Sequence, residues 1–137
     1  MAENIDLEIA TPERELVREH VDDVQLPGKD GYMGILPGHA PLLSELGTGF
    51  LSYSAGGGRR RFLAIHGGFV EVLPDQVRVL ADLAERAEEI DVERARKAFQ
   101  RSQEQLVNPA LGVDPAVALD AMHRAEARLA AAEHKES

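Results

Sequence analysis

Apolar and polar residues alternate along the first half of the chain, which is the pattern of β-strands with one buried face. Ile5, Leu7 and Ile9 are apolar and are separated by polar residues. Short strands that are broken by glycine and proline favour a sandwich or a flattened barrel. We therefore predict an N-terminal β-sandwich (flattened barrel) over residues 1–84. Further strand-like runs follow at residues 24–26, 50–54, 61–66, 68–73 and 77–81.

Glycine and proline mark the expected turns between these runs. Segment 27–43 is rich in both residues and must contain turns. Gly56, Gly57 and Gly58 lie between two strand-like runs and predict the tip of a β-hairpin. The Pro-Asp pair at 74–75 predicts the turn between the next two runs.

The period of the pattern changes at Leu83, where valine, isoleucine, phenylalanine and glycine give way to alanine, glutamate, arginine and lysine. Asp91 is expected to cap a first helix, and the Asn-Pro pair at 108–109 to end it. The Asp-Pro pair at 114–115 suits the start of a second helix, because proline needs no partner for an N–H there. Residues 85–137 are thus predicted to form two helices, at about 91–107 and 114–134.

Each predicted helix has a narrow apolar stripe, and the short loop between the helices predicts an antiparallel hairpin. The stripes are rich in alanine, so their burial roughly offsets the cost of ordering the helices. We therefore expect a hairpin that is able to dock, detach or extend. The stripe residues are Val92, Ala95, Phe99 and Leu106 on the first helix, and Ala118, Met122, Ala125, Leu129 and Ala132 on the second.

Composition and charge limit the partners of the chain. It has 137 residues and a formal net charge of −9, which disfavours binding to nucleic acids. Cysteine is absent, so neither a disulfide nor a thiolate zinc site is possible. The N-terminus carries acids where a signal peptide would carry bases, and no run of ~18 apolar residues follows. A cytoplasmic protein with no metal site is expected.

The histidines give little support for catalysis. They lack metal-ligand spacing, and neither HExxH nor GxSxG occurs. A small hydrolase that uses His39 or His66 remains an alternative, but no nucleophile with a base is visible, so we expect no catalytic residue. The GGGRRR run at 56–61 lacks the strand–loop–helix setting of a phosphate-binding loop, which favours a solvated hairpin tip.

The helical region holds a more informative set of arginines. Arg94 and Arg101 are seven residues apart, and Arg124 and Arg128 are four apart, so each pair shares one helix face. In a closed hairpin, four guanidinium groups could converge on a polyphosphate. Two acids that precede the first helix could bind a ribose or an adenine amino group, namely Glu85 and Asp91. The alternative is an ordinary exposed helix, on which acids and bases pair.

Four segments resemble a known family. Residues 34–43 resemble the G-I-L-P-x-H-A-P-L segment of the epsilon subunits of F-type ATP synthases. Residues 66–72 contain the family's G-G-F-V-E-V strand, and residues 77–82 match the VRVLAD segment that closes its β domain. Residues 90–95 match its I-D-x-x-R-A motif. These matches keep their order over nearly the whole chain.

The resemblance implies a non-catalytic rotor subunit in the central stalk. Such a subunit binds gamma and the ring of c subunits, couples ion flow to ATP synthesis and is held peripherally at the cytoplasmic face of the cell membrane. Its hairpin can extend towards the catalytic alpha/beta head and inhibit ATP hydrolysis. A free-standing nucleotide sensor is the competing hypothesis for the arginine faces.

The resemblance also implies particular sites. No cofactor is required, but ATP is a possible regulatory ligand on the closed hairpin, and its contacts carry over to Glu85, Asp91, Arg94, Arg101, Arg124 and Arg128. Tyr32, Met33 and His39 are the candidates for the interface with gamma and the c ring. Tyr32 stands where some relatives carry an acid, so a charge pair there is replaced by ring or apolar contacts. The connection 107–114 looks longer than in ATP-binding members.

Overall fold

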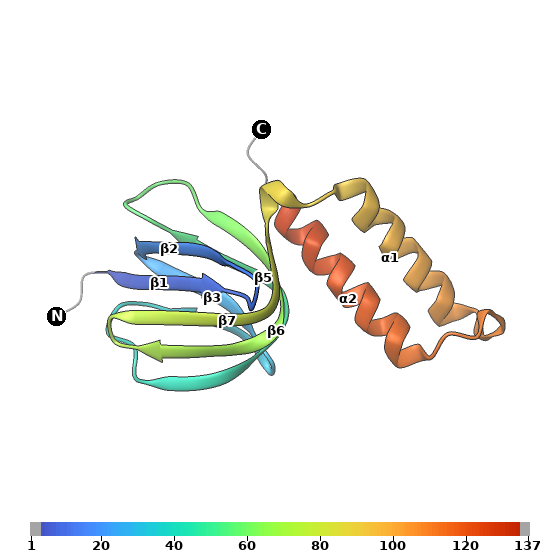
Figure 1. Cartoon of the computed structure of the whole chain (residues 1–137), viewed down its shortest axis with the longest axis horizontal. Helices are drawn as coiled ribbons and strands as arrows, with labels where there is room; N and C mark the ends of the chain where they lie inside the picture. Colours follow the sequence, from blue (N-terminus) through green and yellow to red (C-terminus); the bar gives the residue numbers. More distant parts are fainter. Residues whose placement is uncertain (1–3, 135–137) are drawn as a thin grey trace.

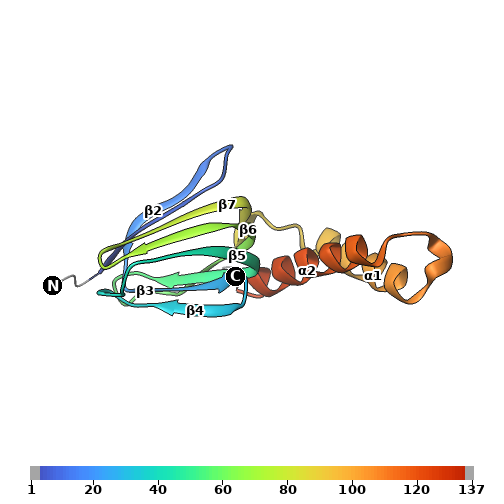
Figure 2. The same ribbon diagram turned by 90° about the horizontal axis from the view of Figure 1, so that it is seen from below.

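The computed structural model describes residues 4–134, which form a β-sandwich followed by a helical hairpin (Figures 1 and 2). The predicted order of the two parts is therefore confirmed. The strands are β1 Ile5–Ala10, β2 Glu15–Val21, β3 Asp23–Gly28, β4 Gly31–Ile35, β5 Leu42–Ser54, β6 Arg61–Leu73 and β7 Gln76–Arg86. The helices are the short η1 Ala87–Glu89 and η2 Pro109–Leu111, and the longer α1 Val92–Val107 and α2 Pro115–Ala132.

The strands form one sheet in the order β2-β1-β7-β6-β5-β3-β4, which curves over itself to enclose the core. β1 and β7 run parallel, whereas the other neighbouring strands are antiparallel. The sheet is open between its edge strands β2 and β4, so the sandwich is not a closed barrel. The alternating residues of β1 point inwards as predicted, because Ile5, Leu7 and Ile9 are fully buried.

Several strands extend beyond the predicted runs. β4 lies within segment 27–43, for which the sequence analysis named only turns. β5 already begins at Leu42. β7 continues to Arg86, so the end of the strand pattern predicted at Leu83 is wrong. The reason is tertiary, because Ala84 is buried in the sandwich core and pairs with Ile65 of β6. Pairing and burial override the weak strand preference of alanine and glutamate.

The predicted turns are confirmed. Gly56 and Gly57 have positive φ at the tip of the β5–β6 hairpin, and Pro74 and Asp75 join β6 to β7. The runs 61–66 and 68–73, however, belong to a single strand.

An irregularity at Gly67 and Gly68 changes which residues of β6 point out of the sandwich. A strict two-residue period would place His66 and Phe69 on opposite faces of the sheet. Gly67 and Gly68 have positive φ, and across them the buried positions change from Leu63 and Ile65 to Val70 and Val72. His66 therefore faces the hairpin side of the sheet, where it contacts Glu85, while Phe69 is exposed farther along the same strand.

We expect Gly68→Ala to lower the free energy of unfolding by roughly 3 kcal/mol. Its φ is +117°, and an added Cβ would overlap the carbonyl oxygen of Leu80. Gly34→Ala is the matched control, because nothing lies within 4 Å of its added Cβ and its φ is not positive. Urea titration of both variants measures the difference. Equal stabilities would show that the backbone at Gly68 is not constrained.

The hairpin packs in two layers, with α2 against β5 and β6 and α1 beyond it (Figure 1). The helix caps agree with the sequence, because Asp91 accepts from the Arg94 N–H and Asp114 accepts from the Ala116 N–H. In the predicted stripes Ala95, Ala118 and Ala125 are buried.

A second buried face of α2 was not predicted. Ala127 and Ala131 pack with Ala64 of β6 and with Ile90, and together they attach the hairpin to the sandwich. No helix among residues 4–134 is long and apolar enough to cross a membrane.

A candidate anion-binding cleft between sandwich and hairpin

A cleft of about 660 Å³ lies between the end of β7 and the two helices. β7 and η1 supply one wall, the first three turns of α1 supply another, and α2 contributes one arginine. The lining residues are Glu85, Glu89, Asp91, Glu93, Arg94, Ala95, Lys97, Ala98, Arg101 and Arg128.

Glu85 is held between the two parts of the chain. Its Oε1 atom accepts a hydrogen bond from Arg128 Nε of α2 at 2.7 Å. The same oxygen lies 3.1 Å from His66 Nε2 of β6. One carboxylate oxygen therefore joins β6, β7 and α2.

The other acids of the cleft are also engaged. An acid with a partner repels an incoming anion less than an unpaired one does. The three partnerships are Glu89 with Arg14 at 2.7 Å, Asp91 with the backbone N–H of Arg94 at 3.1 Å, and Glu93 with Arg96.

The cations on α1, in contrast, are available. Arg94, Lys97 and Arg101 occupy positions i, i+3 and i+7, so they share one helix face. Within residues 4–134 none of these three side chains has an ion pair or a hydrogen bond. The sequence reasoning missed Lys97, although its spacing from Arg94 and Arg101 places it on the same face. The cleft thus combines satisfied acids with unsatisfied cations, which is an arrangement suited to a polyanion.

The structure brings together five of the six predicted nucleotide contacts: Glu85, Asp91, Arg94, Arg101 and Arg128. It does not place Arg124 with them. Arg124 binds Asp120, one turn earlier on α2, and is absent from the cleft lining.

The predicted interface residues lie at the β4 edge of the sheet, outside the lining of the cleft. Tyr32 and Met33 are on the edge strand β4, and His39 is in the loop that follows it. The Tyr32 hydroxyl accepts from the backbone N–H of Phe50 at 3.1 Å, and Tyr32 is 56% exposed. Met33 packs partly against the core, so Tyr32 offers the larger contact surface of the two.

An outer apolar patch on β5, β6 and β7 was not predicted. We define it as Leu43, Phe69, Leu80 and Leu83, which are 73%, 52%, 52% and 41% exposed. Phe69 and Leu80 are directly paired across β6 and β7, and Leu43 is diagonal to Phe69. Exposed apolar residues that gather on neighbouring strands indicate a surface for a protein partner.

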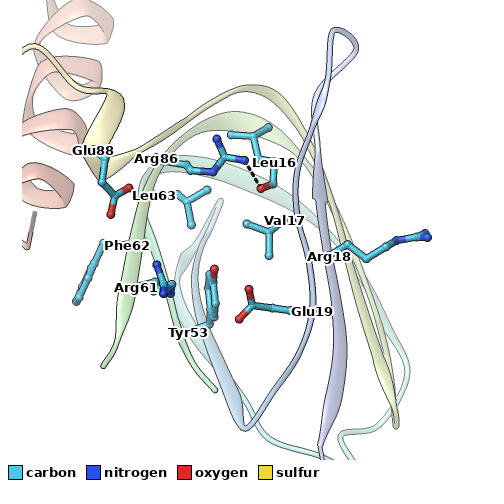
Figure 3. A pocket seen from close by; sticks show the side chains of 10 residues that line it. All are labelled: Leu16, Val17, Arg18, Glu19, Tyr53, Arg61, Phe62, Leu63, Arg86 and Glu88. Atoms are coloured by element: carbon cyan, nitrogen blue, oxygen red, sulfur yellow. Dashed lines mark hydrogen bonds between the residues drawn. The ribbon is translucent and has the colours of Figure 1, made fainter. Parts of the chain in front are cut away.

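A smaller hollow of about 190 Å³ lies between β2 and the ends of β5 to β7 (Figure 3). Burial raises the pKa of Tyr53 to about 12 there. Arg86 Nη2 donates to the backbone oxygen of Leu16 at 2.6 Å. Basic and acidic side chains are mixed in its wall, namely Arg18, Arg61 and Arg86 with Glu19 and Glu88. Among residues 4–134 no group of three potential metal ligands is close enough to hold an ion.

We expect Arg128→Leu to raise the pKa of Glu85. Partial burial raises this pKa, but hydrogen bonds from His66 and Arg128 outweigh it and hold the pKa below the ordinary 4.5. A carboxylate with a depressed pKa stabilises the fold above its ordinary pKa, and this contribution is lost as the pH falls through the lowered value. Carboxyl NMR titration measures the shift.

Arg124→Leu is the control for this titration, because Arg124 binds Asp120 and not Glu85. The pKa of Glu85 should stay at the wild-type value in that variant. A shift of equal size in both variants would contradict the placement of Arg124 outside the cleft.

Comparison with known proteins covers both parts of the chain. Residues 4–87 match the family model of the ATP synthase delta/epsilon chain β-sandwich domain, and residues 88–133 match that of the delta/epsilon chain long α-helix domain. The ATP synthase epsilon chain of Solibacter usitatus is 63% identical over 135 residues, covering 98% of this chain and 100% of the relative. That of Syntrophobacter fumaroxidans is 48% identical over 133 residues, covering 97% and 98%.

A solved structure has the same architecture over the whole length. A chain in the Euglena gracilis mitochondrial ATP synthase structure, whose description names OSCP, F1 and the c-ring, matches with a TM-score of 0.79. The two chains are 28% identical, and the match covers 98% of this chain and 84% of that chain.

Proposed function

The chain belongs to the family of ATP synthase delta/epsilon chains, and we propose that it acts as a central-stalk subunit with a regulatory hairpin. Its relatives are non-catalytic subunits of that complex, which removes the hydrolase alternative based on His39 or His66. The observation that carries the proposal is the match of residues 4–133 to both domain models, in a chain whose hairpin docks on the sandwich mainly through alanines of α2.

The outer apolar patch is the proposed docking surface for gamma. Leu43, Phe69 and Leu80 gain most from leaving water, because their side chains are large and at least half exposed. Tyr32 and the neighbouring loop with His39 are the proposed contact with the c ring. Docked in this way, the chain is held at the cytoplasmic face of the membrane by its partners and couples ion flow to ATP synthesis.

We expect Phe69→Glu to reduce gamma binding by at least about 100-fold, because it places a charge at the centre of the patch. Co-purification of tagged chain with gamma and the c ring from native membranes tests the proposal, and titration with purified gamma gives the affinity. Val107→Glu is the control, because Val107 is 81% exposed on the hairpin, away from the patch. Recovery of neither partner by the wild-type chain would refute the central-stalk function.

The hairpin is proposed to be the regulatory element. Apart from Ile90, the fully buried residues that attach α2 to the sandwich are alanines, and partly buried side chains pack against them. The alanines are Ala64, Ala127, Ala131 and Ala132, and the partly buried residues are Phe50, Phe62 and Val92. Alanine buries little apolar area, and Phe50 and Phe62 keep part of their surface in water even in the docked form. We therefore propose that the hairpin can leave the sandwich. An extended hairpin can then reach the catalytic alpha/beta head and inhibit ATP hydrolysis.

ATP is the proposed ligand of the cleft. Its phosphates would lie against Arg94, Lys97 and Arg101, and Glu85 and Asp91 would be near the ribose or the adenine amino group. The cleft needs both the sandwich and the closed hairpin, so a ligand bound there stabilises the closed form only. ATP would therefore oppose extension and inhibition.

A free-standing nucleotide sensor is the second candidate, and the unpaired cations of α1 favour it. Binding to purified gamma distinguishes the sensor from the stalk subunit. A chain that binds ATP in calorimetry but does not bind purified gamma is a sensor and not a stalk subunit.

A further inference from the structure

His66 lies behind the cleft and contacts it only through Glu85. It is 7% exposed on β6 and is not among the residues that line the cleft. Its Nε2 and the Nε of Arg128 share the same Glu85 oxygen, at 3.1 and 2.7 Å. The family's G-G-F-V-E-V motif begins at Gly67, one residue after His66. The motif therefore assigns no role to His66.

The hydrogen bonding defines the form of His66. Glu85 has a lowered pKa and is an ionised acceptor, so His66 Nε2 must carry a hydrogen and donate it. His66 Nδ1 is buried and has no partner among residues 4–134. The Nε2 atom is therefore the ring nitrogen through which His66 acts. His66 is therefore an orienting donor.

This donor fixes two groups that face the cleft. Because Oε1 of Glu85 is held by both partners, Oε2 is left without a hydrogen bond within the described residues. Arg128 uses its Nε for Glu85, which leaves its two terminal nitrogens free to grip an anion. The contacts between His66, Glu85 and Arg128 thus orient one acceptor, Oε2 of Glu85, and two donors, the terminal nitrogens of Arg128.

We propose that His66 is a positioning residue of the cleft, acting through Glu85 to hold Arg128 ready for a polyphosphate. The inference rests on the proposed ATP binding and adds a residue to that site. If His66 only stabilised the fold, replacing it would change the ATP affinity by the same factor whether or not Glu85 is present.

The test is a double-mutant cycle on the full chain, with ATP affinity measured by calorimetry. His66→Phe keeps a ring but removes the donor, and we expect roughly five- to tenfold weaker binding. His66→Gln restores an N–H donor at a similar reach and should recover most of the affinity. In a Glu85→Ala background, His66→Phe should have no further effect, because its route to Arg128 is already lost.

A second measurement needs no ligand. The Arg128 side-chain Nε–H should exchange with water several-fold faster in His66→Phe than in wild type and His66→Gln, as followed by NMR. Unchanged exchange, or an equal loss of affinity in both Glu85 backgrounds, would overturn the inference. A wild-type chain that binds no ATP would refute the proposed ligand and this role in binding it, and the exchange data would then report only whether His66 orders Arg128.

Discussion

A chain cut after Glu89 is expected to keep a folded sandwich, whereas a chain cut after Leu83 is expected to lose roughly 3 kcal/mol or more of stability. Residues 84–86 pair with residues 63–65 of β6, and Ala84 and Ala87 are buried. The longer chain also keeps the ion pair of Glu89 with Arg14 at 2.7 Å. Thermal unfolding of the two truncated chains measures the difference.

The chain cut after Glu89 should also separate docking from regulation. Its outer apolar patch is intact, so it should bind gamma as the full chain does. ATP hydrolysis by the reconstituted complex should rise, because no hairpin remains to reach the catalytic head. The full chain in the same complex is the control. Unfolding of this truncated chain would contradict the division into two parts, and unchanged hydrolysis would contradict the regulatory role.

Replacing both Arg94 and Arg101 with alanine is expected to weaken ATP binding at least about 100-fold. Each guanidinium faces the cleft without an ion pair in the described part of the chain, so each is free to bind phosphate. Calorimetry with ATP measures the loss. Stability should change little, because both side chains are exposed and neither removes a buried contact.

Two arginines of the same helices provide controls for this experiment. Arg96 is on α1 but is paired with Glu93, and Arg124 is on α2 but is paired with Asp120. Arg96→Ala and Arg124→Ala should each change ATP affinity by less than about threefold, because neither lines the cleft. A large loss in Arg124→Ala would mean that the hairpin closes further around the ligand. If the double variant bound ATP normally, the cleft would not be the ATP site.

The candidate site was only partly predictable from the sequence. Helix spacing correctly placed Arg94 and Arg101 on one face, and the same rule would have added Lys97. It could not separate Arg124 from Arg128, because residues four apart lie on the same face about 6 Å apart along the axis. Which of them reaches Glu85 depends on where α2 crosses the sheet. Sequence spacing could not pair His66 with Glu85, because the two residues are nineteen positions apart.

Local chemistry was sufficient for the parts of the chain that local interactions decide. Alternation predicted the buried face of β1, glycine and proline predicted two hairpin turns, and Asp91 and Asp114 predicted the helix starts. The family motifs identified the architecture. The strand face, the turns and the helix starts are each fixed by residues within about one turn or one strand of each other.

Only the tertiary structure decided where β7 ends, which second face α2 buries and which charges meet. Ala84 and Glu85 belong to a strand because β6 pairs with them, and Ala127 and Ala131 are buried because the sheet covers them. The balance of the cleft likewise arises from long-range partners, since Arg14 and His66 engage its acids while the α1 cations are left free. These outcomes depend on contacts between distant segments, whose energies are absent from any local pattern.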